Sequence, residues 1–407
     1  MIKHERLAWF YVYVWVLLIY LTIPIARRIQ ETVRANDAAW LFFWFTVAVF
    51  TLLAAWLVVQ VWRRVWIISS LRMILLGIIL GIFLSLTWML RRNPEEAIHF
   101  VQYGILTILI FRAYRFRLSD PSIFFATSML GIMLGIIDEL IQWITPRRYF
   151  DYRDIGINTL AVVLMSIAIA LVVKLPYSWR VASAGGMRAG FKWLAVNLLL
   201  LLFCLMNTAS MKEWYSRYIP AANRVPTVTA EYGYLYRDPE IGTFKSRLSP
   251  VELARQDMER SSEMSAIIKQ IRTEEQYNSF IGSTPPHRQP FLVEARVHLF
   301  RRDRHATTAR HTGNPEEKVR SAIIALRENQ ILERYFPNTL RESGHWWRDD
   351  IRAYFTPLVP EDAFYASPVS HYLITGFSRR TVLFAIIPLL VLSLAGARCY
   401  GGKQRHE

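Results

Sequence analysis

Long apolar runs without charged side chains constrain this chain more than any other feature of its sequence. A helix needs about 20 residues to cross the ~30 Å hydrocarbon core of a bilayer, and most of these runs come within a few residues of that length. They lie at residues 7–25, 39–62, 73–90, 97–111, 121–137, 155–173, 193–211 and 381–397. The sequence therefore predicts an all-α polytopic membrane bundle with about eight transmembrane helices.

The charge of the chain fits a membrane surface better than a nucleic acid. The formal net charge is +16, yet 53% of the residues are hydrophobic. Lys and Arg lie mainly in short segments between the apolar runs, where cations face lipid headgroups. We therefore expect membrane lipids as partners and no nucleic acid.

The same cations predict an orientation. With the N-terminus inside, the short segments assigned to the inner side contain more Lys and Arg than those assigned to the outer side. Because short cytoplasmic loops are enriched in these residues, we expect a multi-pass protein of the inner (cytoplasmic) membrane with both termini in the cytoplasm.

A long polar segment, residues 212–380, precedes the last apolar run. Ser249 caps a predicted helix that runs to about residue 279, and Asn314 caps a second helix that should end near Phe336. Residues 291–300 alternate with the period of a half-buried strand. We expect a small α+β domain on the extracytoplasmic side, inserted before the last transmembrane helix.

These signals divide the chain into five predicted parts. They are three transmembrane helices at 1–92, a three-helix region at 94–175, a connection and seventh helix at 176–211, the polar domain at 212–380, and the last helix with a cytoplasmic tail at 381–407.

Polar residues interrupt the fourth, fifth and sixth predicted helices near one end of each. A carboxylate pair such as Asp138-Glu139 is expensive to place in a bilayer and calls for an explanation. The predicted topology brings the three helix ends to one level at the outer membrane surface. The residues expected to gather there are His99, Tyr103, Asp138, Glu139, Gln142, Arg148, Asp151, Asp154 and Asn158.

The order and spacing of these residues resemble the VanZ-like family. The resemblance lies within residues 94–175 and is carried by His99-Phe100-x-x-Tyr103, Asp138-Glu139-x-x-Gln142, Pro146-x-Arg148, Asp151, Asp154-Ile155 and Asn158. It implies a membrane protein of a group associated with teicoplanin resistance. The chain departs from the family pattern at Gln102, where an acid is frequent, and at Arg147 and Ala161, where glycine is common.

The polar residues have two interpretations of about equal weight. They form either a structural network that holds three helices together, or a site for lipid-linked cell-wall precursors or glycopeptide-related ligands. A further alternative is an intramembrane hydrolase or transferase, with Asp138 or Glu139 as acid/base and His99 as partner. The sequence has no HExxH spacing and no nucleotide-binding motif, so we expect neither a metal nor a cofactor.

Two groups of residues in the polar domain contain side chains typical of binding sites. One tract, His345-Trp346-Trp347-Arg348, is expected either to touch lipid or glycan or to belong to the core of the domain. The other group is expected to be a solvated strand face and loop, and comprises Glu294, His298, Arg301, Arg302, Asp303, Arg304 and His305.

Overall fold

The computed structural model describes residues 2–35, 40–62, 70–91, 94–146, 148, 150–172, 182–225, 228–360, 363–370 and 375–403. Most of these residues are helical, and one two-stranded sheet is present among them. The chain forms two compact units. The first, called the membrane unit, comprises Met1–Leu205, Ile219–Thr229 and Leu383–Glu407, and the second, called the polar domain, comprises Met206–Tyr218 and Ala230–Val382.

The membrane unit contains one long helix for each predicted apolar run. These helices are α1 (Ile2–Ala35), α2 (Trp40–Trp62), α3 (Ser70–Met89), α4 (Ile98–Tyr114), α5 (Ser122–Ile144), α6 (Tyr152–Val172), α7 (Ala184–Met206) and α15 (Arg379–Lys403). Among the described residues, six helices are long and apolar enough to cross a bilayer. In the other two, α2 and α4, the apolar stretches found are shorter, at Trp40–Leu53 and Ile98–Tyr114. The chain is therefore a mostly helical membrane protein.

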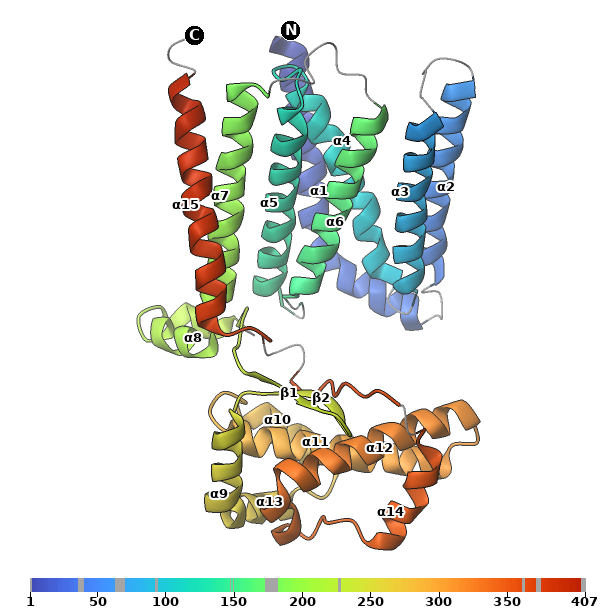
Figure 1. The fold of residues 1–407 in the computed structure, drawn as a ribbon, viewed down its shortest axis with the longest axis vertical. Helices are drawn as coiled ribbons and strands as arrows, with labels where there is room; N and C mark the ends of the chain where they lie inside the picture. Colours follow the sequence, from blue (N-terminus) through green and yellow to red (C-terminus); the bar gives the residue numbers. More distant parts are fainter. Residues whose placement is uncertain are drawn as a thin grey trace. The chain divides into compact units, whose positions relative to one another are not determined.

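Helix α4 lies among other helices, in contact with α1, α5 and α6 (Figure 1). Its side chains Phe100, Tyr103, Leu106 and Ile110 are at most 1% exposed. A helix with so many buried side chains packs against protein along most of its length. This position explains how the shortest apolar run, which also contains His99, is accommodated in the bundle.

Helices α7 and α15 pack side by side through small and aromatic residues (Figure 1). A Cβ atom at Gly396 would lie 2.9 Å from the Phe191 ring, so the ring packs directly on the backbone of α15. The Phe191 ring also stacks on Tyr400, with ring centroids 6.0 Å apart. The last helix is thus held to α7 by close packing.

The polar domain is built mainly from helices. Its elements are α8 (Ala209–Ser216), β1 (Tyr234–Asp238), β2 (Gly242–Ser246), α9 (Pro250–Gln270), α10 (Glu274–Ser283), α11 (Pro290–His311), α12 (Pro315–Tyr335), α13 (Pro337–Glu342) and α14 (Asp349–Phe355), with short 3₁₀ turns elsewhere in the chain at Pro94–Ala97, Pro220–Arg224 and Thr356–Leu358. The short connection between α11 and α12 allows these helices to pack along each other. Phe244, Phe291 and Phe336 are almost completely buried in the core.

The two strands form an antiparallel hairpin, with Tyr236 opposite Phe244 and Asp238 opposite Gly242. Gly242 has φ +114°, and a Cβ atom there would lie 1.9 Å from the carbonyl oxygen of Tyr365. Only glycine fits this combination of backbone conformation and close approach. The turn therefore brings residue 365 and its neighbours against the sheet.

The strand predicted at residues 291–300 is wrong, because these residues form the first half of α11. The alternation arose because Glu294, Arg296 and His298 follow one another at every second position. All three are buried rather than solvated. A helix that is buried on most sides has no solvent-exposed polar face and therefore no clear helical pattern of polar residues. A chance alternation of polar and apolar residues was therefore interpreted as a strand.

Both predicted helix starts in this domain are confirmed. The Ser249 hydroxyl accepts a hydrogen bond from the Glu252 N–H, and the Asn314 side chain accepts hydrogen bonds from two N–H groups of the first turn of α12. The first helix ends earlier than predicted, because Thr273 forms a capping box with Gln276 and starts α10.

The sequence predicted that the group around Glu294 and His298 is a solvated face. This prediction is wrong, because most of the group belongs to buried networks. Glu294, His298 and Arg302 are at most 2% exposed. In the tract at 345–348, Trp347 belongs to the core, where it stacks on Phe355.

Glu328 on α12 is the central acceptor of one of these networks. Its carboxylate lies 2.5 Å from His298 Nδ1 and accepts hydrogen bonds from Arg301 Nε (2.9 Å), Tyr365 OH (2.5 Å) and Ser367 Oγ (2.9 Å). Burial raises the pKa of Glu328, but the interactions with His298, Tyr365 and Arg301 outweigh this effect and lower the pKa overall. The carboxylate thus joins α11, α12 and the segment near residue 365.

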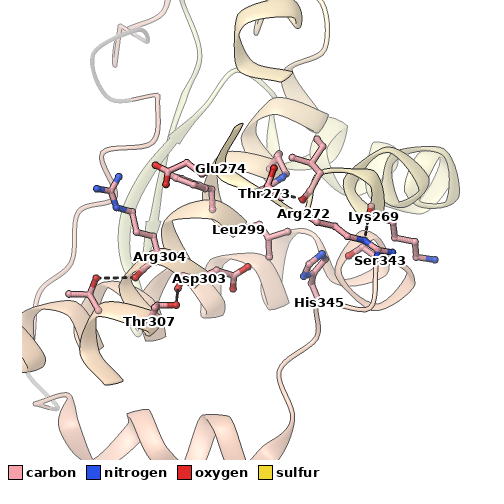
Figure 2. Close-up of a pocket in the computed structure, with 14 residues that line it drawn as sticks. Lys269, Arg272, Thr273, Glu274, Leu299, Asp303, Arg304, Thr307, Ser343 and His345 are labelled. Atoms are coloured by element: carbon pink, nitrogen blue, oxygen red, sulfur yellow. Dashed lines mark hydrogen bonds between the residues drawn. The ribbon is translucent and has the colours of Figure 1, made fainter. Parts of the chain in front are cut away.

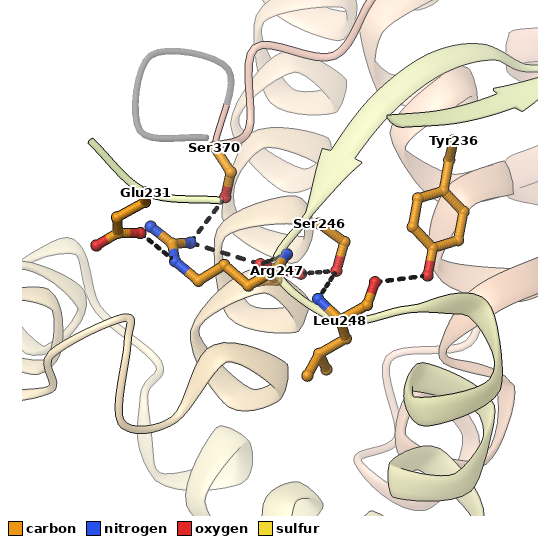
Figure 3. A network of polar contacts seen from close by, with 7 residues as sticks. Glu231, Tyr236, Ser246, Arg247, Leu248 and Ser370 are labelled. Atoms are coloured by element: carbon orange, nitrogen blue, oxygen red, sulfur yellow. Dashed lines mark hydrogen bonds and ion pairs between the residues drawn. The ribbon is translucent and has the colours of Figure 1, made fainter. Parts of the chain in front are cut away.

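Arg247 holds a second network beside the hairpin (Figure 3). Its guanidinium pairs with Glu231 at 2.6 Å and Glu294 at 3.5 Å, and donates to Ser370 Oγ at 3.1 Å. Ser246 Oγ donates to Glu294 at 2.5 Å. Burial raises the pKa of Glu294 despite these partners. The end of β2 is therefore tied to α11 and to both flanking segments of the domain.

Replacing Glu328 should destabilise the polar domain strongly. In Glu328→Ala, the buried groups of His298, Arg301 and Tyr365 lose their acceptor, and breaking such a buried pair costs about 3–5 kcal/mol. Hydrogen exchange of the α11 and α12 amides in the full-length protein would measure the loss. Because the folded pKa of Glu328 is lowered, its contribution is present above the unfolded value near 4.5 and is lost as the pH falls further.

Glu259→Ala is the matched control for this change. Glu259 is an exposed carboxylate that pairs with Arg255 on the same helix. Exchange in α11 and α12 should be unaltered in this variant. Equal exchange rates in the two variants would contradict the central role of Glu328.

Candidate polar site

The predicted polar residues meet at one end of the membrane unit. Helix α1 begins and α15 ends at one end of this unit, whereas α4 begins, α5 ends and α6 begins at the other (Figure 1). The fourth, fifth and sixth helices pack against one another, so the polar residues near these three ends form one cluster. We call it the polar cluster; its members are His99, Tyr103, Asp138, Glu139, Gln142, Arg148, Asp151, Asp154 and Asn158.

One half of the polar cluster is internally hydrogen-bonded. Glu139 is fully buried; one carboxylate oxygen accepts a hydrogen bond from Gln142 Nε2 at 2.7 Å, and the other accepts from the Asp151 N–H at 3.2 Å. Arg148 in turn donates to the Gln142 side-chain oxygen. These contacts fold the loop after α5 back onto the helix that precedes it, and both Glu139 oxygens are occupied.

The other half brings polar groups within reach of one another but leaves several of their atoms without a hydrogen bond of normal geometry. Asp138 and Asn158 are 1% exposed and Tyr103 is fully buried. Within the part of the chain that the structure describes, no hydrogen bond satisfies His99 Nδ1, Tyr103 OH, Asp138 Oδ1 or either amide atom of Asn158. Asp138 lies close enough to His99 for electrostatic interaction, and the Tyr103 hydroxyl is within reach of its carboxylate as a donor. We call this half the open half of the cluster.

The rim of the cluster carries the remaining charges. Arg153 pairs with Glu96 at 2.7 Å, and its N–H donates to Asp151 Oδ1 at 2.8 Å. Asp154, on the first turn of α6, is half-buried and interacts electrostatically with Asp151 and Arg148. This rim joins the start of α6 to the segment before α4.

Close helix packing beside the open half depends on Gly135 of α5. A Cβ atom at this position would lie 3.0 Å from Asn158 Cβ and 3.4 Å from the Tyr103 ring. The glycine lets α5 approach both α4 and α6 at the level of Asn158. The positions of Tyr103 and Asn158 relative to Asp138 therefore depend on the absence of a Cβ atom at Gly135.

Helix α1 contributes residues that the sequence did not single out. Tyr20 OH donates to the Leu134 carbonyl at 2.9 Å and lies close enough to Asp138 for electrostatic interaction. The Trp15 indole donates to the Gln102 carbonyl at 3.0 Å. In the sequence these aromatic residues are indistinguishable from the rings that anchor many membrane helices, so no single-sequence signal identifies them.

The three departures from the family pattern fall in different surroundings. Gln102 is half-buried on α4, one turn from His99, and leaves its position without a charge. Ala161 is fully buried on α6. Arg147 lies outside the described residues. The loss of an acid at position 102 leaves Asp138 and Glu139 as the buried carboxylates of the cluster.

The arrangement can bind polar groups but offers few ligands to a metal ion. Within the described ranges, no group of three or more His, Cys, Asp or Glu side chains could hold a metal. The open half instead provides an acceptor at Asp138, a donor at Tyr103 and both functions at Asn158. Such a set is complementary to a hydroxyl or amide group.

The comparison with protein families gives a match to the VanZ/LLP1 family over residues 8–174. The predicted family resemblance is thus confirmed, and the match extends over α1–α3 as well as the region at 94–175. Comparison with curated proteins and with solved structures gave no match. The matched residues include Tyr20 and every member of the polar cluster.

Alanine substitutions at two glycines should separate the effect of close packing from that of helix propensity. Alanine favours a helix by up to ~1 kcal/mol relative to glycine. At Gly135 this gain is opposed by overpacking against Asn158, which typically costs about 1–3 kcal/mol. We expect Gly135→Ala to lower the melting temperature of the purified protein.

Gly156→Ala is the control, because a Cβ atom at Gly156 would have no atom within 4 Å. This variant should melt at the same temperature as the unchanged protein or slightly higher. A Gly135→Ala variant that is as stable as Gly156→Ala would show that close packing at this point is unimportant.

Proposed function

Because residues 8–174 form a VanZ-like membrane region, we propose that the polar cluster binds a polar group of a lipid-linked cell-envelope precursor or a glycopeptide-related ligand. The observation that carries the proposal is the open half of the cluster, where buried polar groups converge and several of their atoms lack a hydrogen bond of normal geometry. An unsatisfied buried polar group costs about 1–3 kcal/mol. A ligand that supplies a donor to Asp138 and an acceptor to Tyr103 would remove that cost.

The proposed site faces the outside of the cytoplasmic membrane. In this proposal all eight long helices cross the bilayer, so both termini lie in the cytoplasm and the polar domain lies outside. The distribution of Lys and Arg supports this orientation. The role that follows is in antibiotic tolerance or envelope maintenance.

An intramembrane hydrolase or transferase is the second candidate, and the neighbourhood of Asp138 and His99 favours it. In that case Asp138 and not Glu139 would be the acid/base, because both Glu139 oxygens already accept hydrogen bonds. Glu139 would position Gln142 and the loop at Asp151. The two candidates share the same residues and differ in whether the ligand is changed chemically.

Asp138→Asn tests the shared site. This change keeps the shape of the side chain but removes the charge and replaces one acceptor with a donor. We expect glycopeptide tolerance of cells that depend on the protein to fall to the level of cells that lack it, while the amount of membrane-inserted protein is maintained. Thin-layer analysis of lipid-linked precursors would show whether a product also disappears, as the second candidate requires.

Asp120→Asn is the matched control at the other end of α5. Asp120 is a buried carboxylate that accepts hydrogen bonds from the Ser122 and Ser183 N–H groups, and an asparagine oxygen can accept the same bonds. Tolerance should persist in this variant. Full tolerance in Asp138→Asn would refute both candidates.

A further inference from the structure

A pocket of the polar domain lies where α9 ends, α10 begins and α11 passes beside them (Figure 2). Its volume is about 670 Å³, large enough for a small organic molecule. Four cationic side chains line it, from Lys269, Arg272, Arg296 and Arg304. The pocket is separate from the polar cluster, so its function stands apart from the proposal above.

Arg296 is the unusual cation of this pocket. It is 6% exposed, and its guanidinium lies over the Tyr277 ring, 5.0 Å from the ring centroid. Its Nη2 donates to the Ile271 carbonyl at 3.1 Å, but its Nε–H is buried and unsatisfied in the described structure. None of the described carboxylates lies within ion-pair distance of it, and Asp303, which interacts with it electrostatically, is paired with Arg302. A buried cation without an ion-pair partner of its own is costly, and a bound anion would offset that cost.

The remaining lining groups suit a molecule with several hydroxyls. The hydroxyls of Thr307 and Ser343 donate to backbone carbonyls, so their oxygens remain as acceptors, whereas the Thr273 hydroxyl accepts from the Gln276 N–H and can still donate. The carboxylates of Glu274 and Asp303 are further acceptors. The Asp303 carboxylate pairs with Arg302 at 2.8 Å, so its charge is already balanced. Figure 2 shows Asp303 and His345 near Leu299, a core residue that is 2% exposed.

The chemistry excludes two simpler ligands. Inorganic phosphate alone would occupy a small part of 670 Å³ and would leave the hydroxyl groups unused. A nucleic-acid base would need a free aromatic ring for stacking. Of the two rings in this wall, Phe300 is already stacked on Tyr277, with ring centroids 3.9 Å apart and planes 4° apart, which leaves the His345 imidazole as the other ring.

We propose that this pocket binds an anionic saccharide, with Arg296 and Arg304 at its phosphate or carboxylate group and the hydroxyl and carboxylate side chains at its sugar hydroxyls. Guanidinium groups bind phosphate and carboxylate oxygens through paired hydrogen bonds. Lys269 and Arg272 add positive charge at the opening.

Calorimetric titration of the full-length protein in detergent tests the proposal. The probes are glucose 6-phosphate, glucuronic acid, glucose and inorganic phosphate. We expect at least one of the two anionic sugars to bind about tenfold or more tightly than both glucose and inorganic phosphate. Tighter binding of glucose 6-phosphate would identify a phosphate, and tighter binding of glucuronic acid would identify a carboxylate, as the preferred anion.

Variants at exposed positions keep the test independent of folding. Arg304→Gln and Lys269→Gln should each weaken binding of the anionic sugar about fivefold or more. Arg310→Gln is the control, since Arg310 is an exposed cation of the same helix α11 that does not line the pocket. Binding of glucose as tight as that of both anionic sugars, or equal affinities in Arg304→Gln and Arg310→Gln, would overturn the proposal.

Discussion

Burial of the adjacent carboxylates Asp138 and Glu139 is the constraint on which the VanZ-like region depends. Neither group can rest against lipid, so each requires protein around it. Glu139 has its partners in Gln142 and the backbone of the following loop. Asp138 has close neighbours but retains an unsatisfied oxygen. The same helix turn therefore contains one carboxylate, Glu139, that stabilises the following loop, and one, Asp138, with an oxygen that can accept a hydrogen bond from a ligand.

The polar domain also contains deeply buried carboxylates. Glu328 and Glu294 are as deeply buried as the carboxylates of α5, yet each accepts several hydrogen bonds. Their partners come from segments far apart in the sequence, so these networks specify how the helices and the hairpin fit together. Arg296 shares an unsatisfied Nε–H with Arg327 and Arg352, but of these three arginines it is Arg296 that lines the pocket between α9, α10 and α11.

Much of the membrane unit could be predicted from the sequence because lipid imposes a simple rule on composition. Each apolar run became a helix, and the polar residues at three helix ends were expected to meet. The contribution of Tyr20 could not be predicted, because it depends on which face of α1 packs against α5. The helix at residues 291–300 was not predicted because its polar residues are buried. Polar residues that are buried by hydrogen-bonding partners cannot be distinguished from exposed ones in a pattern of hydrophobicity.

The two ends of the segment inserted between α7 and α15 are in contact. Met206, at the end of α7, accepts a hydrogen bond at its sulfur from Arg379, the first residue of α15, at 3.4 Å. A chain whose entry and exit touch can be gained or lost as a module with little disturbance of its host. The membrane helices could therefore be closed by a short turn in place of some 170 residues, and the VanZ-like region and the polar domain could have separate evolutionary histories.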